Sequence, residues 1–294
     1  MADSPAHQFG QMIGKQLELA VEPALRTIAD HHGLFLDRAG PRPTRSNKKQ
    51  VRWIDAYGNQ HNLDFVLERN GASDRIGTPV AFLETAWRRY TKQSRNKAQE
   101  LQGAVLPIRD QHRFAAPFLG CILAGEFTST ALEQLRSHGF RVLHFPYQNV
   151  VRAFASQGFN AASEEATKDS VLRKRMAAWQ RVSQHRRLAI QKQLLDLNAE
   201  EVSEFMAKLG AAIGRSITQV LVTMLHGTQE NCRGVVEALS YLQSYSTPER
   251  SRPLARCEIS VRYDNGDRID AQFGDIAAAT EFLTGFRSGQ WTPA

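Results

Sequence analysis

The sequence contains little cysteine. Its 294 residues include only Cys121, Cys232 and Cys257, which lie far apart along the chain. An odd, scattered set argues against a disulfide framework and against a zinc site built from cysteines. The sequence also has no apolar run of the ~18 residues that a membrane span requires, and no basic and apolar segments of a secretory signal at its start. We therefore expect a cytoplasmic protein with no membrane partner.

Several catalytic signatures are also missing. We find no P-loop, no G-x-G-x-x-G and no G-x-S-x-G, and the histidines show no H-E-x-x-H or zinc-finger spacing. Nucleotide hydrolysis, α/β-hydrolase chemistry and zinc-protease chemistry therefore have no support. The composition, with 42% hydrophobic and 23% charged residues, is that of a globular protein. We find no internal repeat and no low-complexity tract.

The positive charge is concentrated in three segments. The chain has 37 Lys and Arg against 30 Asp and Glu, a net charge of +7. Segments 38–52, 87–97 and 170–195 hold six, five and seven Lys and Arg and no acidic residue. Clustered cations suit a polyanionic partner, because neutralising phosphates releases counterions. Solvated helix faces and loops are the alternative explanation, but three such clusters favour nucleic acid.

Hydrophobic periodicity predicts a mixed β-sheet flanked by helices, in the α/β (α+β) class. Apolar residues at spacings of three and four predict a helix over 8–32, which Pro23 is expected to kink or split. A loop is predicted at 38–50. The remaining predicted elements are strands at 51–55 and 62–67 joined by a turn at 57–59, a strand at 79–86, a helix at 94–110, a strand at 118–124, a helix at 128–138 and a strand at 140–145.

The pattern divides the chain into three parts. We expect a core over 1–160, a long basic helical connector over 161–196, and a smaller C-terminal α+β module over 197–294. The predicted elements of this module are a helix that begins after Asn198, a strand at 216–225, a helix at 233–245, a hairpin of strands at 256–263 and 268–273, and a final helix capped by Asp275. The module carries no chemical signature, and we assign it to dimerisation or target recognition.

Two carboxylates interrupt apolar strands of the predicted core. Asp64 lies between Leu63 and Phe65, and Glu84 follows Leu83. Charged groups in buried strands are costly unless they are paired or bind a cation. Mg²⁺ prefers oxygen ligands and typically takes one or two carboxylates together with phosphate and water. The two carboxylates therefore predict a magnesium site that activates a water and polarises a phosphodiester.

The order of these elements resembles the core of the PD-(D/E)XK nuclease superfamily, which includes many restriction endonucleases. In that superfamily an Asp near the end of the second strand is followed by Glu-x-Lys or Asp-x-Lys on the third. Asp64 and Glu84 match the two metal ligands, and the backbone carbonyl of Thr85 matches the usual main-chain ligand. The resemblance covers about residues 8–150. It implies a restriction-endonuclease-like fold, a Mg²⁺-dependent endonuclease of restriction or defence acting on double-stranded DNA, a homodimer, and a cognate methyltransferase.

The sequence departs from the family at one position. The motif lysine would stand at 86, where this chain has Ala86. Lys97 is the preferred substitute because it starts the helix after the third strand, and Lys92 is the other candidate. Glu100 shares a helix face with Lys97. Glu18 is a weaker candidate, since the first helix sometimes donates an acid in this superfamily.

Basic and aromatic residues close to this motif and in the other two basic segments are predicted to contact DNA. They are Arg88, Arg89, Tyr90, Arg95, Arg45, Lys48, Lys49, Arg173, Lys174, Arg181, Arg186 and Arg187. Two alternatives remain open. One is a non-catalytic DNA-binding protein on a degenerate nuclease core. The other is a regulatory or assembly subunit of a defence complex. RNA also remains open as the substrate.

Overall fold

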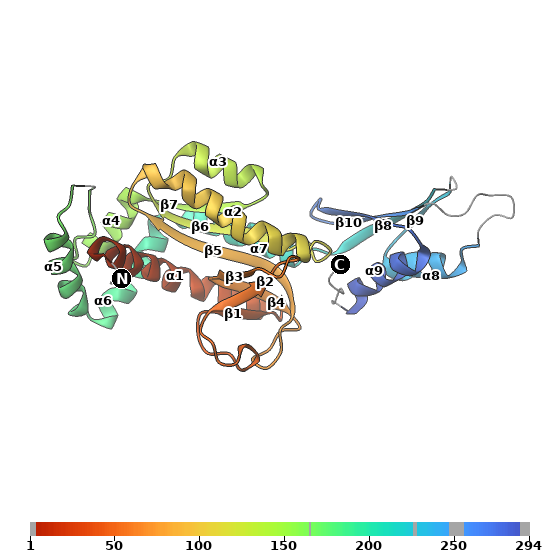
Figure 1. The fold of residues 1–294 in the computed structure, drawn as a ribbon, viewed down its shortest axis with the longest axis horizontal. Helices are drawn as coiled ribbons and strands as arrows, with labels where there is room; N and C mark the ends of the chain where they lie inside the picture. The colour runs from red at the N-terminus through yellow and green to blue at the C-terminus, as the bar shows by residue number, and fades with distance from the viewer. Residues whose placement is uncertain (1–3, 165, 226–227, 247–255, 289–294) are drawn as a thin grey trace.

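A five-stranded mixed sheet organises the larger part of the chain (Figure 1). The computed structural model describes residues 4–164, 166–225, 228–246 and 256–288, and every structural statement below concerns these residues. The sheet has the order β1-β4-β5-β6-β7, in which β5, β6 and β7 run parallel and β1 and β4 run antiparallel. Its strands are β1 (Phe35–Arg38), β4 (Phe65–Arg69), β5 (Thr78–Arg88), β6 (Phe118–Gly125) and β7 (Arg141–Pro146). The mixed α+β architecture expected from the sequence is therefore present.

Helices cover both faces of this sheet. One face packs against α2 (Ser94–Gln111) and α3 (Ser129–Ser137), which connect the parallel strands. The other packs against α1 (Pro5–His31), α4 (Tyr147–Ala155), α5 (Asp169–Gln180), α6 (Gln184–Asp196) and α7 (Ala199–Ile213). Successive strand residues point to opposite faces, so Phe82 and Ala86 of β5 join the α2 side while Leu83 and Trp87 join the α1 side.

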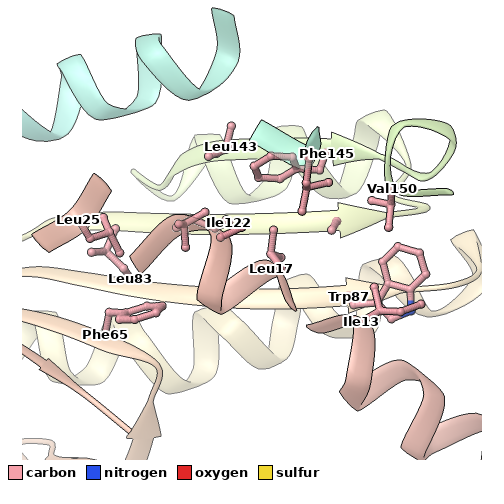
Figure 2. Packing of buried hydrophobic residues seen from close by; sticks show 14 of the residues in the cluster. Ile13, Leu17, Leu25, Phe65, Leu83, Trp87, Ile122, Leu143, Phe145 and Val150 are labelled. Atoms are coloured by element: carbon pink, nitrogen blue, oxygen red, sulfur yellow. The ribbon is translucent and has the colours of Figure 1, made fainter. Parts of the chain in front are cut away.

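Helix α1 lies along the sheet with one apolar stripe. Ile13, Leu17 and Leu25 are buried against β5 and its neighbours (Figure 2). The Ser4 side chain caps the helix by accepting a hydrogen bond from the His7 backbone at 3.2 Å. The expected split at Pro23 is wrong. Pro23 is exposed, and the buried stripe continues past it, so packing holds the helix together even though proline cannot donate a backbone hydrogen bond.

The predicted hairpin is present, but its second strand is shorter than expected. β2 (Val51–Ile54) pairs with β3 (Gln60–Leu63) in a separate two-stranded sheet. The chain then passes through Asp64 into β4, which pairs with β1 and β5. The strand predicted over 62–67 is therefore two strands in two sheets, and Asp64 lies at the break.

The basic connector is not a single long helix. α5 and α6 divide it, and both bury apolar side chains in the same core as α1, including Leu172, Trp179, Ile190 and Leu194. Helix α7, which was predicted to belong to the C-terminal module, also packs there through Phe205 and Leu209. These helices therefore belong to the first sheet, because their apolar faces complete its cover.

The C-terminal part forms a second, four-stranded antiparallel sheet with its own core. Its elements are β8 (Ile217–Met224), β9 (Thr228–Cys232), α8 (Val235–Ser244), β10 (Cys257–Tyr263), β11 (Arg268–Phe273) and α9 (Ile276–Ser288). The predicted hairpin and the Asp275 cap are confirmed, since Asp275 Oδ1 accepts from the Ala278 backbone at 2.8 Å. The predicted end of this module, 289–294, lies outside the described residues.

This second sheet contains a repeat that is not evident in the sequence. Two strands followed by a helix occur twice, and the order β11-β10-β8-β9 places the two units side by side through β8 and β10. Ala238 and Leu242 of α8 correspond to Ala279 and Leu283 of α9, and all four are buried.

Among the described helices, none combines the length and the apolar character that crossing a membrane requires.

Candidate metal and nucleic-acid site

The candidate site lies where β5 extends past its antiparallel neighbour. The pairing with β4 reaches Phe65 opposite Leu83, whereas the pairing with β6 continues to Arg88 opposite Gly125. Residues 84–88 therefore have a strand on one side only. Asp64 immediately precedes Phe65, so the register brings it next to Glu84. Two residues that are 20 positions apart in the sequence are neighbours at this open edge.

Hydrogen bonds fix both carboxylates. Glu84 Oε1 accepts from the Asp64 backbone N–H at 3.0 Å. Asp64 Oδ2 accepts from the Thr85 backbone N–H and from the Thr85 hydroxyl, both at 2.7 Å. The predicted pair of acidic residues is thus brought together, and Thr85, the predicted source of a main-chain ligand, binds directly to one of them.

The electrostatics of this pair are unfavourable in the absence of a cation. Glu84 is buried, and burial followed by the charge of Asp64 raises its pKa well above the ordinary value. Lys97 opposes this rise, whereas Glu100 adds to it. Burial also raises the pKa of Glu18 on α1; Lys15, which donates to Glu18 Oε2 at 2.7 Å, opposes this rise, and Asp64 adds to it. Three acids therefore share one region of negative potential.

Lys97 reaches this region and Lys92 does not. Lys97 stands in the first turn of α2, has a side chain only 14% exposed, and lines the cleft beside Asp64 and Ala86. Its Nζ donates to Glu100 Oε1 at 2.7 Å. Lys92 is exposed in the short 3₁₀ turn Thr91–Gln93 and is not among the residues that line the cleft. Lys97, the preferred substitute for the motif lysine, therefore lines the same cleft as Ala86, where that lysine would stand.

A cleft of about 730 Å³ borders the site through Asp64, Thr85 and Lys97, whereas Glu84 is buried behind it. One wall is the first half of α1, and the other is the end of β5 with the segment that follows it. His7, Gln11, Lys15 and Glu18 line the α1 wall, and sequence reasoning named only Glu18 among them. Their spacing of three or four residues is a polar helical stripe beside the apolar one, which was the available signal.

The residues present fit a hard cation. The structure describes no cluster of three or more His, Cys, Asp or Glu side chains arranged around a metal position. Two carboxylates with a neighbouring carbonyl nevertheless match Mg²⁺, which usually keeps several waters and takes substrate phosphate oxygens. Burial and the neighbouring Asp64 raise the pKa of Glu84, so its ionised form is disfavoured here, and a bound cation would favour that form.

Three of the predicted DNA contacts line the cleft: Arg88, Arg89 and Tyr90. Arg88 is 27% exposed, and its Nη2 lies 3.6 Å from Glu100 Oε2. The Arg89 guanidinium lies over the Tyr90 ring at 4.3 Å from its centre, and the Tyr90 hydroxyl donates to the Glu164 carbonyl at 3.1 Å. Arg95 is exposed on α2. Arg88, Arg89 and Tyr90 therefore share the cleft with Asp64, and Arg95 lies outside its lining.

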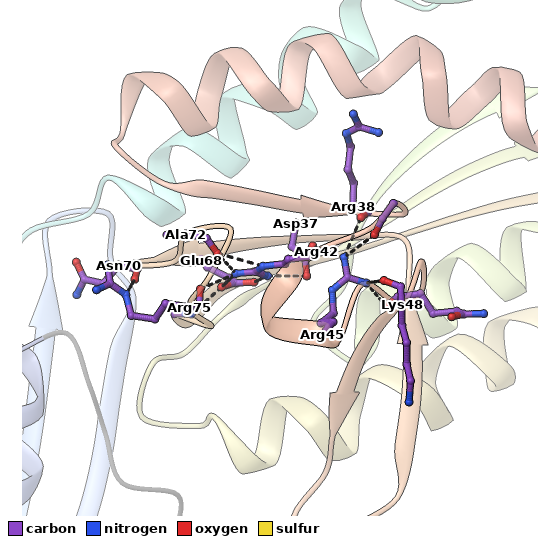
Figure 3. A network of polar contacts seen from close by, with 12 residues as sticks. Asp37, Arg38, Arg42, Arg45, Lys48, Glu68, Asn70, Ala72 and Arg75 are labelled. Carbon is purple, nitrogen blue, oxygen red and sulfur yellow. Dashed lines mark hydrogen bonds and ion pairs between the residues drawn. The ribbon is translucent and has the colours of Figure 1, made fainter.

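Arg45 has a different role from the one predicted. Its side chain is buried, its Nη2 lies 2.9 Å from Asp37 Oδ1, and it donates to the carbonyls of Gly40 and Gln50 (Figure 3). The prediction that it contacts DNA is wrong, because its hydrogen-bonding capacity is used within the loop. Lys48 and Lys49 of the same segment are exposed.

The third basic segment, 170–195, also contains both exposed cations and cations bonded within the protein. Arg173, Lys174 and Arg181 are exposed on α5 and at its end. Arg186 donates to the Gln157 carbonyl, and Arg187 donates to the Trp179 carbonyl at 3.0 Å. The first group is available to a polyanion, whereas the second group holds α6 against its neighbours.

Comparison with known proteins gives little. No family model matches the sequence, and no curated protein matches it. Among solved structures, the crystal structure of a protein of unknown function, AF1548, aligns with 68% of this chain and 98% of its own, at 11% identity and a TM-score of 0.28. A likeness of this size carries no conclusion about fold or activity.

Proposed function

We propose that this protein is a Mg²⁺-dependent DNA endonuclease with a restriction-endonuclease-like core. One observation carries the proposal. The register of β4 and β5 brings Asp64 and Glu84 together at an open strand edge, and both Asp64 and Lys97 line the cleft beside it. Burying this negative charge costs free energy, and a bound cation with its phosphate substrate would offset that cost.

The roles of the residues follow from their positions. Asp64, Glu84 and the carbonyl of Thr85 would hold Mg²⁺, which supplies Lewis-acid polarisation of the phosphodiester and a more acidic water. Lys97, oriented by Glu100, would stabilise the charge that develops on the phosphoryl oxygens. Arg88 and Arg89 would hold neighbouring phosphates in the cleft.

The exposed cations extend this footprint beyond the cleft. Lys48, Lys49, Arg173, Lys174 and Arg181 would contact the backbone of double-stranded DNA without reading its sequence. A restriction or defence enzyme would need two active sites to cut both strands, so we propose a homodimer. A cognate methyltransferase would protect the host DNA.

The test is cleavage of a panel of plasmid and phage DNA in Mg²⁺ and in EDTA. We expect discrete fragments from the wild type in Mg²⁺ alone, and a loss of activity of at least about 100-fold in Glu84→Gln and Asp64→Asn. Glu133→Gln, which changes an exposed Glu on α3, is the matched control and should cut normally. Equal cutting by Glu84→Gln and the wild type would contradict the proposal.

Ala86 favours a second candidate, a DNA-binding protein on a degenerate nuclease core. Lys97 donates to Glu100, and in this candidate that pair is structural and has no catalytic role. Binding of duplex DNA that is unchanged by Mg²⁺, with no cleavage under any condition, would select this candidate. Failure to bind random duplex DNA in a salt-dependent way would select the regulatory or assembly subunit instead.

A further inference from the structure

The β2–β3 hairpin presents a polar face to solvent next to the candidate site. Its inward side chains belong to the core on the α2 side of the sheet. Since side chains alternate along a strand, the outward ones share one face. This outer face consists of Arg52 opposite Asn62 and Ile54 opposite Gln60, all of them exposed. Asn62 precedes Asp64 by two residues, so the outer face begins beside the carboxylates.

The turn of this hairpin is held in one conformation by Asp55. Its Oδ1 accepts from the backbone N–H groups of Tyr57 and Asn59, both at 2.9 Å. Its Oδ2 accepts from the Asn59 side-chain amide at 3.1 Å and lies 2.9 Å from His61 Nε2. Tyr57 is 86% exposed at the tip. The hairpin is therefore a preformed projection, which a ligand can bind without the cost of ordering a loop.

The polar groups of the outer face are available to a ligand. Among the residues that the structure describes, Arg52, Gln60 and Asn62 make no side-chain hydrogen bond or ion pair. No acidic residue lies on the outer face, and the exposed Lys48 and Lys49 precede β2. Arginine donates in pairs to guanine, and asparagine and glutamine form bidentate bonds with adenine, at the base edges of the major groove. The face therefore combines donors for bases with cations for the adjoining phosphates.

The dimensions of the hairpin suit the same groove. A two-stranded ribbon fits the major groove of B-DNA, which is about 12 Å wide. Each strand has four residues, and at about 3.3 Å per residue the face is about 13 Å long. That length covers about four base pairs at 3.4 Å each.

The C-terminal sheet also has a polar face, on the side away from α8 and α9, but its side chains bond to one another. Gln219 donates to Asn231 at 2.7 Å, and Arg262 donates to Gln219 at 3.1 Å. Arg256 donates to Gln272 at 2.6 Å. Contact with bases there would require breaking these bonds, which offsets part of the binding free energy. The hairpin carries no such cost.

We infer that the outer face of the β2–β3 hairpin enters the major groove of duplex DNA and reads the base pairs beside the cut. Arg52 would donate to a guanine, and Gln60 and Asn62 would bind adenines, while Ile54 would contact a thymine methyl group. The inference rests on the proposed function for the identity of the ligand. It adds the element that selects the sequence.

The test is selection from a pool of DNA duplexes with a randomised central segment. The full-length protein binds the pool in EDTA, and the bound fraction is sequenced. We expect the wild type to enrich one sequence. Gln60→Ala and Asn62→Ala should each lose about tenfold or more in discrimination at one base pair of it. Both should keep the wild-type salt slope and affinity for an unenriched duplex, because neither removes a charge. Gln243→Ala, at an exposed position on α8, is the matched control and should keep the wild-type preference.

Affinity for the unenriched duplex and thermal unfolding report whether each variant folds. A variant that does not fold is replaced by threonine at the same position, which favours a strand. The inference would be overturned by a wild type that enriches no sequence, or by folded variants that keep the wild-type preference. A uniform loss of affinity for all duplexes would also overturn it, because that is the effect of a backbone contact.

Cleavage in Mg²⁺ separates this inference from the proposed function. The ends of fragments cut from phage DNA are sequenced, and we expect them within about four base pairs of the enriched sequence. Cuts more than about 10 base pairs away, one helical turn, would overturn the inference and leave the nuclease proposal standing. Enrichment that depends on Gln60 and Asn62, without cleavage of any DNA, would support the inference and contradict the nuclease proposal.

Discussion

Two buried clusters of charge lie on the same sheet and are built in opposite ways. In the first, Arg42 lies 2.6 Å from Glu68 and 2.8 Å from Asp37, with Arg45 2.9 Å from Asp37, so two cations face two anions (Figure 3). Arg42 also donates to the carbonyls of Ala72 and Arg75, each at 2.7 Å. This cluster fastens the loop after β1 to the loop between β4 and β5.

The second cluster, which is formed by Asp64 and Glu84, lacks this pairing of cations with anions. Asp64 and Glu84 lie together, and each accepts hydrogen bonds from backbone N–H groups. Lys97 influences Glu84 electrostatically but donates to Glu100. Burial raises the pKa of Glu68 too, but there Arg42 acts directly against it.

The difference separates a structural role from a functional one. A buried cluster in which cations pair with anions stabilises a loop through those ion pairs, even though Asp37 Oδ2 and Arg45 Nε have no hydrogen-bond partner. A cluster of like charges reduces stability, and the proposed Mg²⁺ would offset that cost. The comparison also explains why the basic segment 38–52 is misread from sequence. Arg42 and Arg45 look like DNA contacts in a run of basic residues, and the fold uses them internally.

We expect the largest loss of stability from breaking the cluster of Arg42, Arg45, Asp37 and Glu68. Glu68→Gln should lower the free energy of unfolding by about 3–5 kcal/mol, because it leaves the buried Arg42 without its closest anion. Urea unfolding measures this change. A decrease smaller than about 1 kcal/mol would mean that the network is not a structural lock.

His112, a partly buried group outside both clusters, tests whether a titratable side chain that lacks a charged partner always indicates a function. His112 packs against Trp53, with ring centres 5.3 Å apart, and burial lowers its pKa from 6.5 to about 4. The unfolded chain therefore takes up the proton first as the pH falls. The contribution of His112 to stability should be constant above pH 6.5 and should decrease down to pH 4, by up to about 3 kcal/mol.

Unfolding between pH 4 and pH 8 compares the wild type with His112→Gln. The variant should show a weaker decrease below pH 6.5. His185→Gln, at an exposed position on α6, is the control and should follow the wild type. An unchanged profile in His112→Gln would remove His112 from the comparison.

We expect Mg²⁺ to stabilise the protein by binding at the Asp64–Glu84 cluster. At about 100 times its dissociation constant, a ligand of the native state adds about 2.7 kcal/mol, which corresponds to a rise in Tm of several degrees for a chain of this size. Asp64→Asn should abolish the rise, whereas Glu100→Gln should keep most of it. An equal rise in wild type and Asp64→Asn would place the metal elsewhere.

Neutralising Glu84 should change the free energy of unfolding in the opposite direction to Glu68→Gln. Glu84→Gln keeps an oxygen for the Asp64 backbone N–H and removes a buried charge. We expect the free energy of unfolding at pH 7 to rise by about 1 kcal/mol, since a charge without a partner no longer has to be desolvated. Destabilisation comparable with that of Glu68→Gln would end the distinction between the two clusters.

The smallest effect on stability is expected at the surface of segment 38–52. The double variant Lys48→Gln, Lys49→Gln should change stability by less than about 0.5 kcal/mol. It should also reduce the slope of log affinity for DNA against log salt by about one for each phosphate that is no longer neutralised. Arg45→Gln should do the reverse, with lower stability and an unchanged slope. Similar slopes in both variants would contradict the division into exposed and internal cations.

Much of the local structure could be predicted from the sequence. The strand at 79–86, the helix at 94–110 and the hairpin at 256–273 are confirmed, because each carries a strong periodic pattern or turn signal. The division of the strand at Asp64 and the packing of α5 to α7 on the first sheet could not be predicted. Both depend on which surface a segment meets, and residues distant in the sequence supply that surface.

The sequence by itself determined the element types, the segregation of positive charge and the two acids in apolar strands. Only the tertiary structure decided which of those charges face a cleft. Strand register placed Asp64 beside Glu84, and loop closure turned Arg42 and Arg45 inward while Lys48 stayed in solvent. The physical reason is that the free energy of a charge depends on its solvation and its neighbours, and a linear sequence records neither.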